Sequence, residues 1–325
     1  MSKIKYLFGT LFIFIFTQTA MAQEISYKVD NGSFNYKHAV YLTPSQELTL
    51  KFDVKNTKSI RWYQIIPDTS KFYKNANHPW EKKPYKWVGF GKIEYKKVEI
   101  DAFKNRREVK LTTAILQENQ PENNAFYNPN FGSFWFEVEA TLENGTKVKS
   151  KGLKNMTYRG LSTKVFRVSY MLSDDYIGYL TTFFNVPGIF GSIAYQSKNY
   201  IGVDCADVLM ATSAVMNKKK LKDYNVAMLV AKLKKEATLT ITNGNLNKRL
   251  QWNQDFQRGD FIAVKYNKNG RYAHIGMLYK DENNNGILDK KDTIINAGPT
   301  ALRITTLEEG GFNGTVAILD NVDMQ

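Results

Sequence analysis

Residues 201–209 read Ile-Gly-Val-Asp-Cys-Ala-Asp-Val-Leu and hold the only cysteine of the chain, Cys205. Apolar side chains then recur at helical spacing: Val208, Leu209, Val215 and Met216. This spacing predicts a helix, and Asp204 is a favourable N-cap for it. Cys205 then becomes the first helical residue, where unpaired backbone N–H groups and the helix dipole favour a thiolate near neutral pH. A buried, inert cysteine is the alternative that this segment alone leaves open.

Two further polar residues lie on strands expected downstream of this helix. A second amphipathic helix is expected over Tyr224–Glu236. Strand-like runs follow it at Asp260–Tyr266, Arg271–Lys280 and 294–298. The second run contains His274 and the third contains Asn296. Either residue alone is most simply structural. A helix-tip cysteine followed by a strand histidine and a strand asparagine indicates a nucleophile, a base and an orienting group.

Four short motifs occur in this order: Val203-Asp204-Cys205-Ala206, Gly259-Asp260-Phe261-Ile262, His274-Ile275-Gly276-Met277-Leu278 and Ile295-Asn296-Ala297. Together they resemble the NlpC-type papain-like cell-wall peptidases. In that family an Asp-Cys pair opens a helix, a Gly-Asp pair introduces an apolar strand, and a strand with His, a hydrophobic residue and Gly follows. A third polar residue lies on the next strand. The resemblance covers roughly residues 190–319 and implies an α+β papain-like domain.

The resemblance also implies roles for individual residues. Cys205 matches the nucleophile, His274 the general base and Asn296 the orienting residue. Tyr195 matches a tyrosine that lies near the oxyanion site in the family. The sequence departs from the family pattern after the cysteine, where Ala206-Asp207 stands in place of the usual Ser-Gly, and the usual glycine pair before the cysteine is missing. The third residue is commonly histidine in the family, and asparagine is the papain arrangement.

The chemistry of these side chains is coherent without the family. A thiolate at Cys205 attacks an amide carbonyl to give an acyl-enzyme, and backbone N–H groups at the helix start stabilise the oxyanion. His274 takes the thiol proton and later delivers one to the leaving amine, while Asn296 fixes the imidazole tautomer. No cofactor is needed for these steps. Because a carboxylate in the first turn opposes a thiolate, we expect Asp207 to point away from the sulfur.

The first half of the chain has the alternation of β structure. Apolar residues alternate with polar ones at Leu48, Leu50, Phe52 and Val54, and again from Phe134 to Leu142. Asn144-Gly145 is a hairpin-turn pair. Further strands are expected over Ile60–Ile66, Lys97–Ala102 and Val109–Leu116. Because helical periodicity is absent, we expect an antiparallel sandwich that resembles the immunoglobulin type. Aromatic residues and lysines mix in residues 78–87, which we interpret as a long loop able to stack on sugars, or to cap the sandwich.

The N-terminus has the pattern of an export signal. Residues 1–22 combine a basic start, an apolar run over Tyr6–Phe16 and the small-residue ending Ala20-Met21-Ala22, so we expect cleavage before Gln23. The apolar run is shorter than the roughly 20 residues of a membrane span. A formal net charge of +14 favours anionic partners such as cell-wall polymers. Nucleic acid is not an expected partner, because no nucleic-acid-binding module is recognisable.

Residues 281–292 follow the twelve-residue calcium-loop pattern. Glycine stands at the sixth position, Gly286, and the candidate ligands are Asp281, Asn283, Asn285, Ile287 through its carbonyl, Asp289 and Asp292. The aspartate at the last position is shorter than the usual glutamate, which predicts weak binding. A structural Ca²⁺ here would stiffen the hairpin between His274 and Asn296. The alternative is a solvated hairpin tip.

We therefore expect a signal peptide over 1–22, an all-β immunoglobulin-like sandwich over 23–158 and an α+β papain-like domain of NlpC type over 159–325. The favoured function is an exported cysteine hydrolase, periplasmic or extracellular, that cleaves an amide bond in peptidoglycan stem peptides. Its partner would be peptidoglycan or another anionic cell-wall polymer. One alternative is a thiol hydrolase or acyltransferase acting on another amide or ester. The other is a non-catalytic, calcium-dependent cell-surface binding protein with an inert Cys205.

Overall fold

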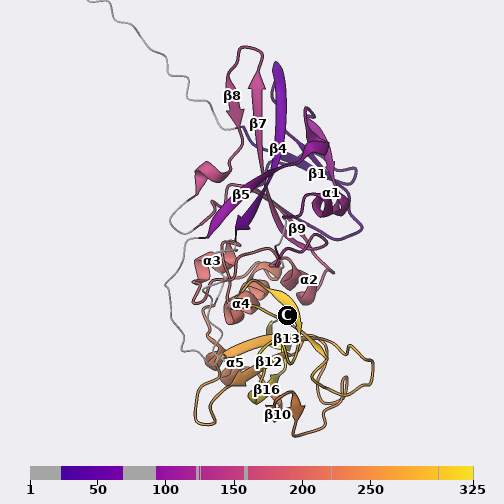
Figure 1. Ribbon diagram of the computed structural model, residues 1–325, viewed down its shortest axis with the longest axis vertical. Coiled ribbons are helices and arrows are strands. Elements are labelled where there is room, and N and C mark those ends of the chain that lie inside the picture. The colour runs from indigo at the N-terminus through magenta and orange to yellow at the C-terminus, as the bar shows by residue number, and fades with distance from the viewer. Residues whose placement is uncertain are drawn as a thin grey trace, which may run out of the picture.

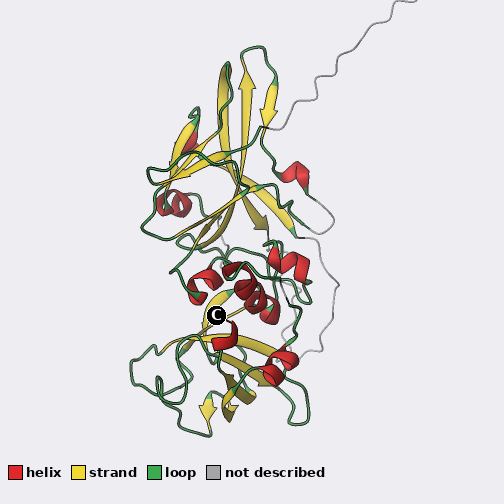
Figure 2. Ribbon diagram, turned by 180° about the vertical axis from the view of Figure 1, so that it is seen from behind, coloured by secondary structure: helices red, strands yellow, loops and turns green. Residues whose placement is uncertain are grey.

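Strands dominate the computed structural model, which describes residues 23–68, 93–121, 124, 126–156, 160–220, 222–298 and 300–324. The chain is 36% strand and 16% helix, arranged in several sheets, as expected for a β-rich multidomain protein. Two sheets form the upper part of the molecule and a third forms the lower part, with most of the helices between them (Figures 1 and 2). The expected signal peptide at 1–22 and the aromatic loop at 78–87 lie outside the described residues.

The upper part is a sandwich of two sheets. The smaller sheet has the order β1 (Ser26–Val29), β3 (Leu48–Lys51) and β6 (Glu108–Leu111). The larger has the order β2 (Ala39–Leu42), β9 (Phe166–Tyr170), β7 (Gly132–Leu142), β4 (Thr57–Asp68) and β5 (Glu94–Glu99), with β8 (Lys147–Lys149) paired to β7. Leu50, Trp62 and Phe134 share the buried core between the two sheets. The alternating apolar pattern predicted this core.

Three local features differ from the sequence expectation. The strands β2 and β9 pair in parallel, so the sandwich is not wholly antiparallel. The strand β9 belongs to the larger sheet of the sandwich, so this sheet extends beyond residue 158, where we expected the sandwich to end. The strand expected over Val109–Leu116 ends at Leu111, because the hydroxyl of Thr112 accepts the N–H of Ile115 and caps helix α1 (Thr113–Glu118).

The lower part is one seven-stranded antiparallel sheet. Its order is β11 (Asn245–Leu246), β10 (Lys235–Thr242), β16 (Gly314–Leu319), β12 (Phe261–Lys265), β13 (His274–Lys280), β14 (Thr293–Asn296) and β15 (Arg303–Thr306). The helix expected over Tyr224–Glu236 is shorter, because α5 (Val226–Lys232) stops where Leu233 turns extended and β10 begins to pair with β16. Within the described residues, no helix has the length and apolar character to cross a bilayer.

Helix α4 (Cys205–Met216) covers one face of the lower sheet. Ala206 and Val208 of the helix share a buried cluster with Ile275, Met277 and Ile295 of the sheet. The opposite face of the sheet has its own core, which includes Val264, Leu278 and Phe312. Short helices α2 (Tyr176–Thr181) and α3 (Ala194–Lys198) pack against α4. Because most of α4 is buried between the sheet and the neighbouring helices, its first turn is fixed relative to β13 and β14.

A buried cation joins the upper and lower parts. The guanidinium of Arg167 on β9 lies 3.4 Å from the centre of the Tyr200 ring and donates to the Tyr41 hydroxyl at 2.8 Å. Tyr200 in turn stacks on Phe183, with ring centres 4.2 Å apart and planes 2° apart. Ile65 of the upper part also shares the buried cluster under α4. The chain just before Cys205 is therefore held against the sandwich.

Replacing Arg167 by lysine should destabilise the protein by about 2 kcal/mol, because lysine cannot reproduce the flat, buried stack on Tyr200. The urea midpoint measures the loss. Arg61→Lys is the matched control: Arg61 is on the same sheet, is exposed, and makes one long ion pair to Glu99 at 3.7 Å, so its change should stay within about 0.5 kcal/mol. Equal effects of both variants would contradict a structural role for the stack.

Candidate functional site

Cys205 is the first residue of α4, as the sequence predicts. The side chain of Asp204 caps the helix and accepts the N–H of Asp207 at 3.2 Å. The segment before the cap is fixed by two backbone hydrogen bonds, from Val203 N–H to Pro187 at 3.0 Å and from Ile189 N–H to Val203 at 2.8 Å. As a residue Cys205 is half-buried.

The sulfur of Cys205 lies at the end of a strand ladder. It accepts a hydrogen bond from the backbone N–H of Ile275, the residue that follows His274. The last paired residues of β13 and β14 are Gly276 and Asn296. Ile275 therefore lies beyond the end of the ladder, where its N–H is available to the sulfur. Packing of α4 on the sheet thus brings the sulfur of the predicted nucleophile to the backbone of the residue that follows the predicted base.

His274 and Asn296 are directly connected by a side-chain hydrogen bond. The Asn296 amide donates to the Thr305 hydroxyl at 2.8 Å, which leaves its oxygen to accept from the imidazole. Gly276 lies opposite Asn296, and a β-carbon there would lie 2.9 Å from the Asn296 β-carbon. The glycine two residues after the histidine is therefore required for the asparagine to fit beside the imidazole.

Burial lowers the pKa of His274 to about 4. The hydrogen bond with Asn296 acts in the opposite direction, and the positive charge of Arg303 lowers the pKa further. The ring also contacts Phe312, with ring centres 5.0 Å apart. His274 is therefore neutral at neutral pH and able to accept a proton.

The resting state of Cys205 differs from the sequence expectation of a thiolate. Burial raises the pKa of the thiol well above its ordinary value, and the carboxylate of Asp204 raises it further. Hydrogen bonds from the N–H groups of Ile275 and Ala206 lower the pKa, and Asp207 raises it. Burial and the two carboxylates outweigh the helix terminus, so the resting protein holds a neutral thiol at Cys205 and a neutral imidazole at His274.

The carboxylate of Asp207 is turned to Ser192, whose hydroxyl donates to it at 2.6 Å. Burial raises the pKa of Asp207 to about 7, and the charges of Asp204 and Asp223 raise it further, against the Ser192 hydrogen bond. Near neutral pH a small change in pH therefore changes the charge next to the sulfur.

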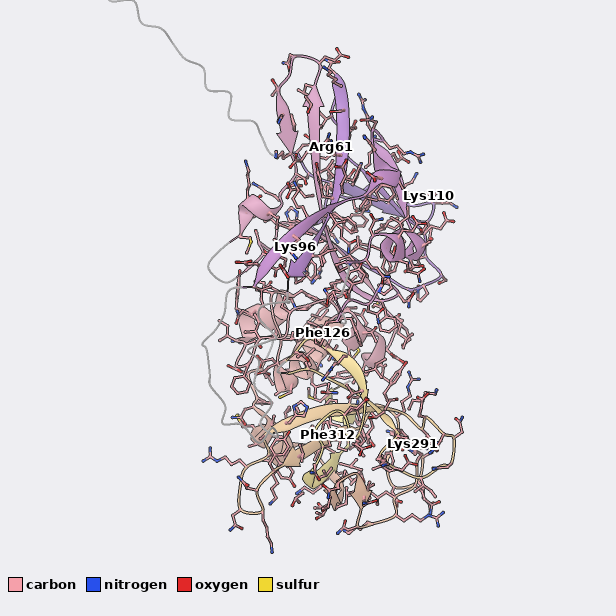
Figure 3. The ribbon with its side chains drawn as sticks, in the orientation of Figure 1. Arg61, Lys96, Lys110, Phe126, Lys291 and Phe312 are labelled. Carbon is pink, nitrogen blue, oxygen red and sulfur yellow. The ribbon has the colours of Figure 1, made fainter. Side chains whose placement is uncertain are left out.

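Other residues at the site carried no clear signal in the sequence. Arg303 follows the last motif on β15 and lies opposite Asn296 in the register. Its guanidinium is 5.9 Å from the centre of the Phe126 ring, and Phe126 belongs to the upper part at the level of the junction (Figure 3). Gly298 has a positive φ of 97°, and a β-carbon there would lie 3.8 Å from the Cys205 nitrogen. Only the folded register brings these residues to the site.

Tyr195 was predicted near the oxyanion site. It lies on α3, with a side chain that is 44% exposed, and α3 packs against α4. This places Tyr195 on the helix that precedes the cysteine segment, but its catalytic assignment stays a prediction.

The predicted calcium loop joins β13 to β14. Asp281 accepts the N–H groups of Asn285 at 3.3 Å and Gly286 at 2.7 Å, and Gly286 has a positive φ of 72°. The side-chain amides of Asn283 and Asn285 both reach one oxygen of Asp289, at 2.8 and 3.0 Å. Polar groups at four of the predicted ligand positions therefore gather around one point.

Asp292, at the last position of this loop, is buried, and its carboxylate accepts from the Trp252 indole at 2.9 Å and the Asp289 N–H at 3.0 Å. Ile287 donates its N–H to the Asn285 side chain at 2.7 Å. In the described part of the chain, no three His, Cys, Asp or Glu side chains are grouped to hold a metal ion. Calcium binding by this loop stays a prediction.

Comparison of the sequence with models of known families, and with curated proteins, found no match, and neither did comparison with solved structures.

Asp207→Asn should make Cys205 more reactive at alkaline pH, because it removes a charge that raises the pKa of the thiol. We expect alkylation by iodoacetamide at pH 8.5 to be up to about tenfold faster than in the wild type. At pH 6 wild-type Asp207 is itself protonated, so the two rates should converge. Asp53→Asn, on the exposed sandwich surface, is the control and should follow the wild type. A constant ratio between pH 6 and 8.5 would contradict this account of the charge.

Calcium should raise the melting temperature, and EDTA should reverse the rise, because a ligand that binds only the folded state stabilises it by about 2.7 kcal/mol at 100 times its Kd. Asp281→Asn and Asp289→Asn should reduce this response. Glu282→Gln is the matched control, since Glu282 lies in the same loop at a position without a ligand role and pairs with Lys280 at 3.2 Å. A wild-type melting temperature that changes with neither calcium nor EDTA would contradict calcium binding by this loop.

Proposed function

We propose that the chain is an exported cysteine hydrolase of papain-like, NlpC-type fold that cleaves an amide bond in peptidoglycan stem peptides. The observation that carries this proposal is the way in which the residues Cys205, His274 and Asn296 are connected. The Cys205 sulfur accepts a hydrogen bond from the residue after His274, and His274 is hydrogen-bonded to Asn296. The order of the four sequence motifs resembles that of the NlpC-type cell-wall peptidases. This resemblance supports an amide bond as the bond cleaved and the cell wall as the substrate.

In the proposed mechanism, His274 acts as a general base on a neutral thiol. The imidazole takes the Cys205 proton as the sulfur attacks the amide carbon, because both groups are neutral in the resting site. The thiolate that develops is stabilised by the N–H groups of Ile275 and Ala206. The imidazolium that develops is stabilised by the oxygen of Asn296. His274 then protonates the leaving amine, and water hydrolyses the thioester.

The oxyanion of the tetrahedral intermediate needs donors near the start of α4. The backbone N–H of Cys205 is one of the unpaired groups of the first helical turn. A β-carbon at position 298 would be in ordinary contact with this nitrogen, 3.8 Å away, and the positive φ of 97° favours glycine at this position. Tyr195 is the proposed side-chain contributor, following the resemblance to the family.

Purified peptidoglycan incubated with the wild type should release stem peptides that mass spectrometry identifies. Cys205→Ala should release none, and His274→Ala should lower kcat by about 10²–10⁴-fold. Asn296→Ala should lower kcat less, with a changed pH profile, because it removes the partner that stabilises the imidazolium. His38→Ala, on the sandwich surface, is the matched histidine control and should retain full activity.

The alternatives give different results in the same experiment. Acylation of Cys205 by an activated ester, without release of stem peptides, would support a thiol hydrolase or acyltransferase with another substrate. Absence of both reactions, together with calcium-dependent binding to cell walls by Cys205→Ala and wild type alike, would support the binding protein.

A further inference from the structure

A hollow at the end of α4 remote from Cys205 is lined by lysines. Its volume is about 310 Å³, and its floor is apolar, formed in part by Met210, Leu233 and Met324. Its rim carries Lys219, Lys220, Lys222 and Lys232. Among the described residues, no carboxylate lines it. Four cations around one hollow repel one another, and this repulsion is relieved when an anion binds between them.

The lysines of the hollow are not neutralised by neighbouring acids. None of the four takes part in an ion pair among the described residues, whereas Lys234, just outside the hollow, pairs with Glu236 at 2.7 Å. The carboxylate of Asp223 belongs to the same segment, but it raises the pKa of Asp204 and Asp207 and does not line the hollow. The ammonium groups of these four lysines are therefore available to bind an anionic ligand.

The backbone fixes where two of these lysines lie. Lys218 has a positive φ of 52°, the Lys218 N–H bonds to Val215 at 3.3 Å, and the Lys219 N–H bonds to Ala214 at 3.0 Å. This is the usual left-handed ending of a helix, in which glycine normally occupies the position of Lys218. The ending turns the chain so that Lys219 and Lys220 face the hollow while Lys218 does not line it.

The other lining groups indicate what accompanies the anion. The ring of Tyr224 lines the hollow and lies 4.9 Å from the Lys232 ammonium. Ser213 and Asn217 add polar side chains on the last turns of α4. An apolar floor with an aromatic ring, hydroxyl and amide groups suits a sugar ring, and the lysines suit carboxylate or phosphate oxygens.

We propose that this hollow is a second binding site, which holds an anionic polymer of the cell envelope through its carboxylate or phosphate groups. The lining that α4 contributes runs from Met210 to Asn217, so the site lies roughly 8 to 18 Å from Cys205 along the helix axis. One polymer chain can therefore bind here while another part of it enters the site at Cys205. This inference rests on the proposed function for its biological use, but binding itself does not require hydrolysis.

The test uses the full chain with Cys205→Ala as background, so that hydrolysis cannot alter the ligand. Binding is measured for soluble glycan strands with stem peptides, for poly(glycerol phosphate) and for double-stranded DNA. Lys220→Gln with Lys222→Gln removes two charges from the hollow. Lys218→Gln with Lys268→Gln removes two exposed charges outside it and is the matched control.

We expect the hollow pair to weaken binding of one of the two envelope polymers about tenfold and the control pair to weaken it less than about twofold. Whether the strands or poly(glycerol phosphate) show the loss identifies carboxylate or phosphate as the recognised group. Equal losses in both pairs, or equal losses for DNA, would mean attraction by net charge and would overturn the site. Binding by the hollow pair that equals wild type would also overturn it. If the wild type releases no stem peptides while the hollow pair still weakens binding as expected, only the proposed function is refuted.

Discussion

The packing of α4 on the lower sheet is the constraint on which the candidate site depends. Neither the cysteine nor the histidine is positioned by a loop: the first belongs to a helix, and the second begins a strand. The buried cluster that includes Val208 and Ile275 sets the distance between these elements. The end of the β13–β14 ladder then leaves one backbone N–H for the sulfur. The position of Cys205 relative to β13 is thus a consequence of core packing and of where a strand pair ends.

The electrostatics of the site are less simple than a helix-tip cysteine implies. A helix terminus favours a thiolate by a modest amount, since the effect is typically worth 0.3–1 kcal/mol at exposed positions. Burial and the capping carboxylate of Asp204 act against it. Asp204, which caps the helix, therefore also raises the pKa of the Cys205 thiol. A neutral thiol at Cys205 is less prone to oxidation and to reaction with electrophiles than a thiolate would be.

The sequence predicted the elements that carry strong local signals. The cap at Asp204, the hairpin turn at Gly145 and the strands around His274 and Asn296 were all visible as patterns. Parallel pairing of β2 with β9 was not, because it depends on contacts between segments more than 120 residues apart. The contributions of Arg303 and Phe126 were invisible for the same reason. The pKa of Cys205 was predicted in the wrong direction, because burial is a property of the packed chain and not of the motif.

The buried cluster under α4 includes Ile65 and Trp135 from the sandwich as well as the faces of the lower helices. Neither part therefore has a complete surface where the two meet. We infer that the halves unfold in a single cooperative transition, and that the sandwich acts as an obligatory folding partner of the lower part. Any fragment that holds only the lower part would present these apolar side chains to water and self-associate.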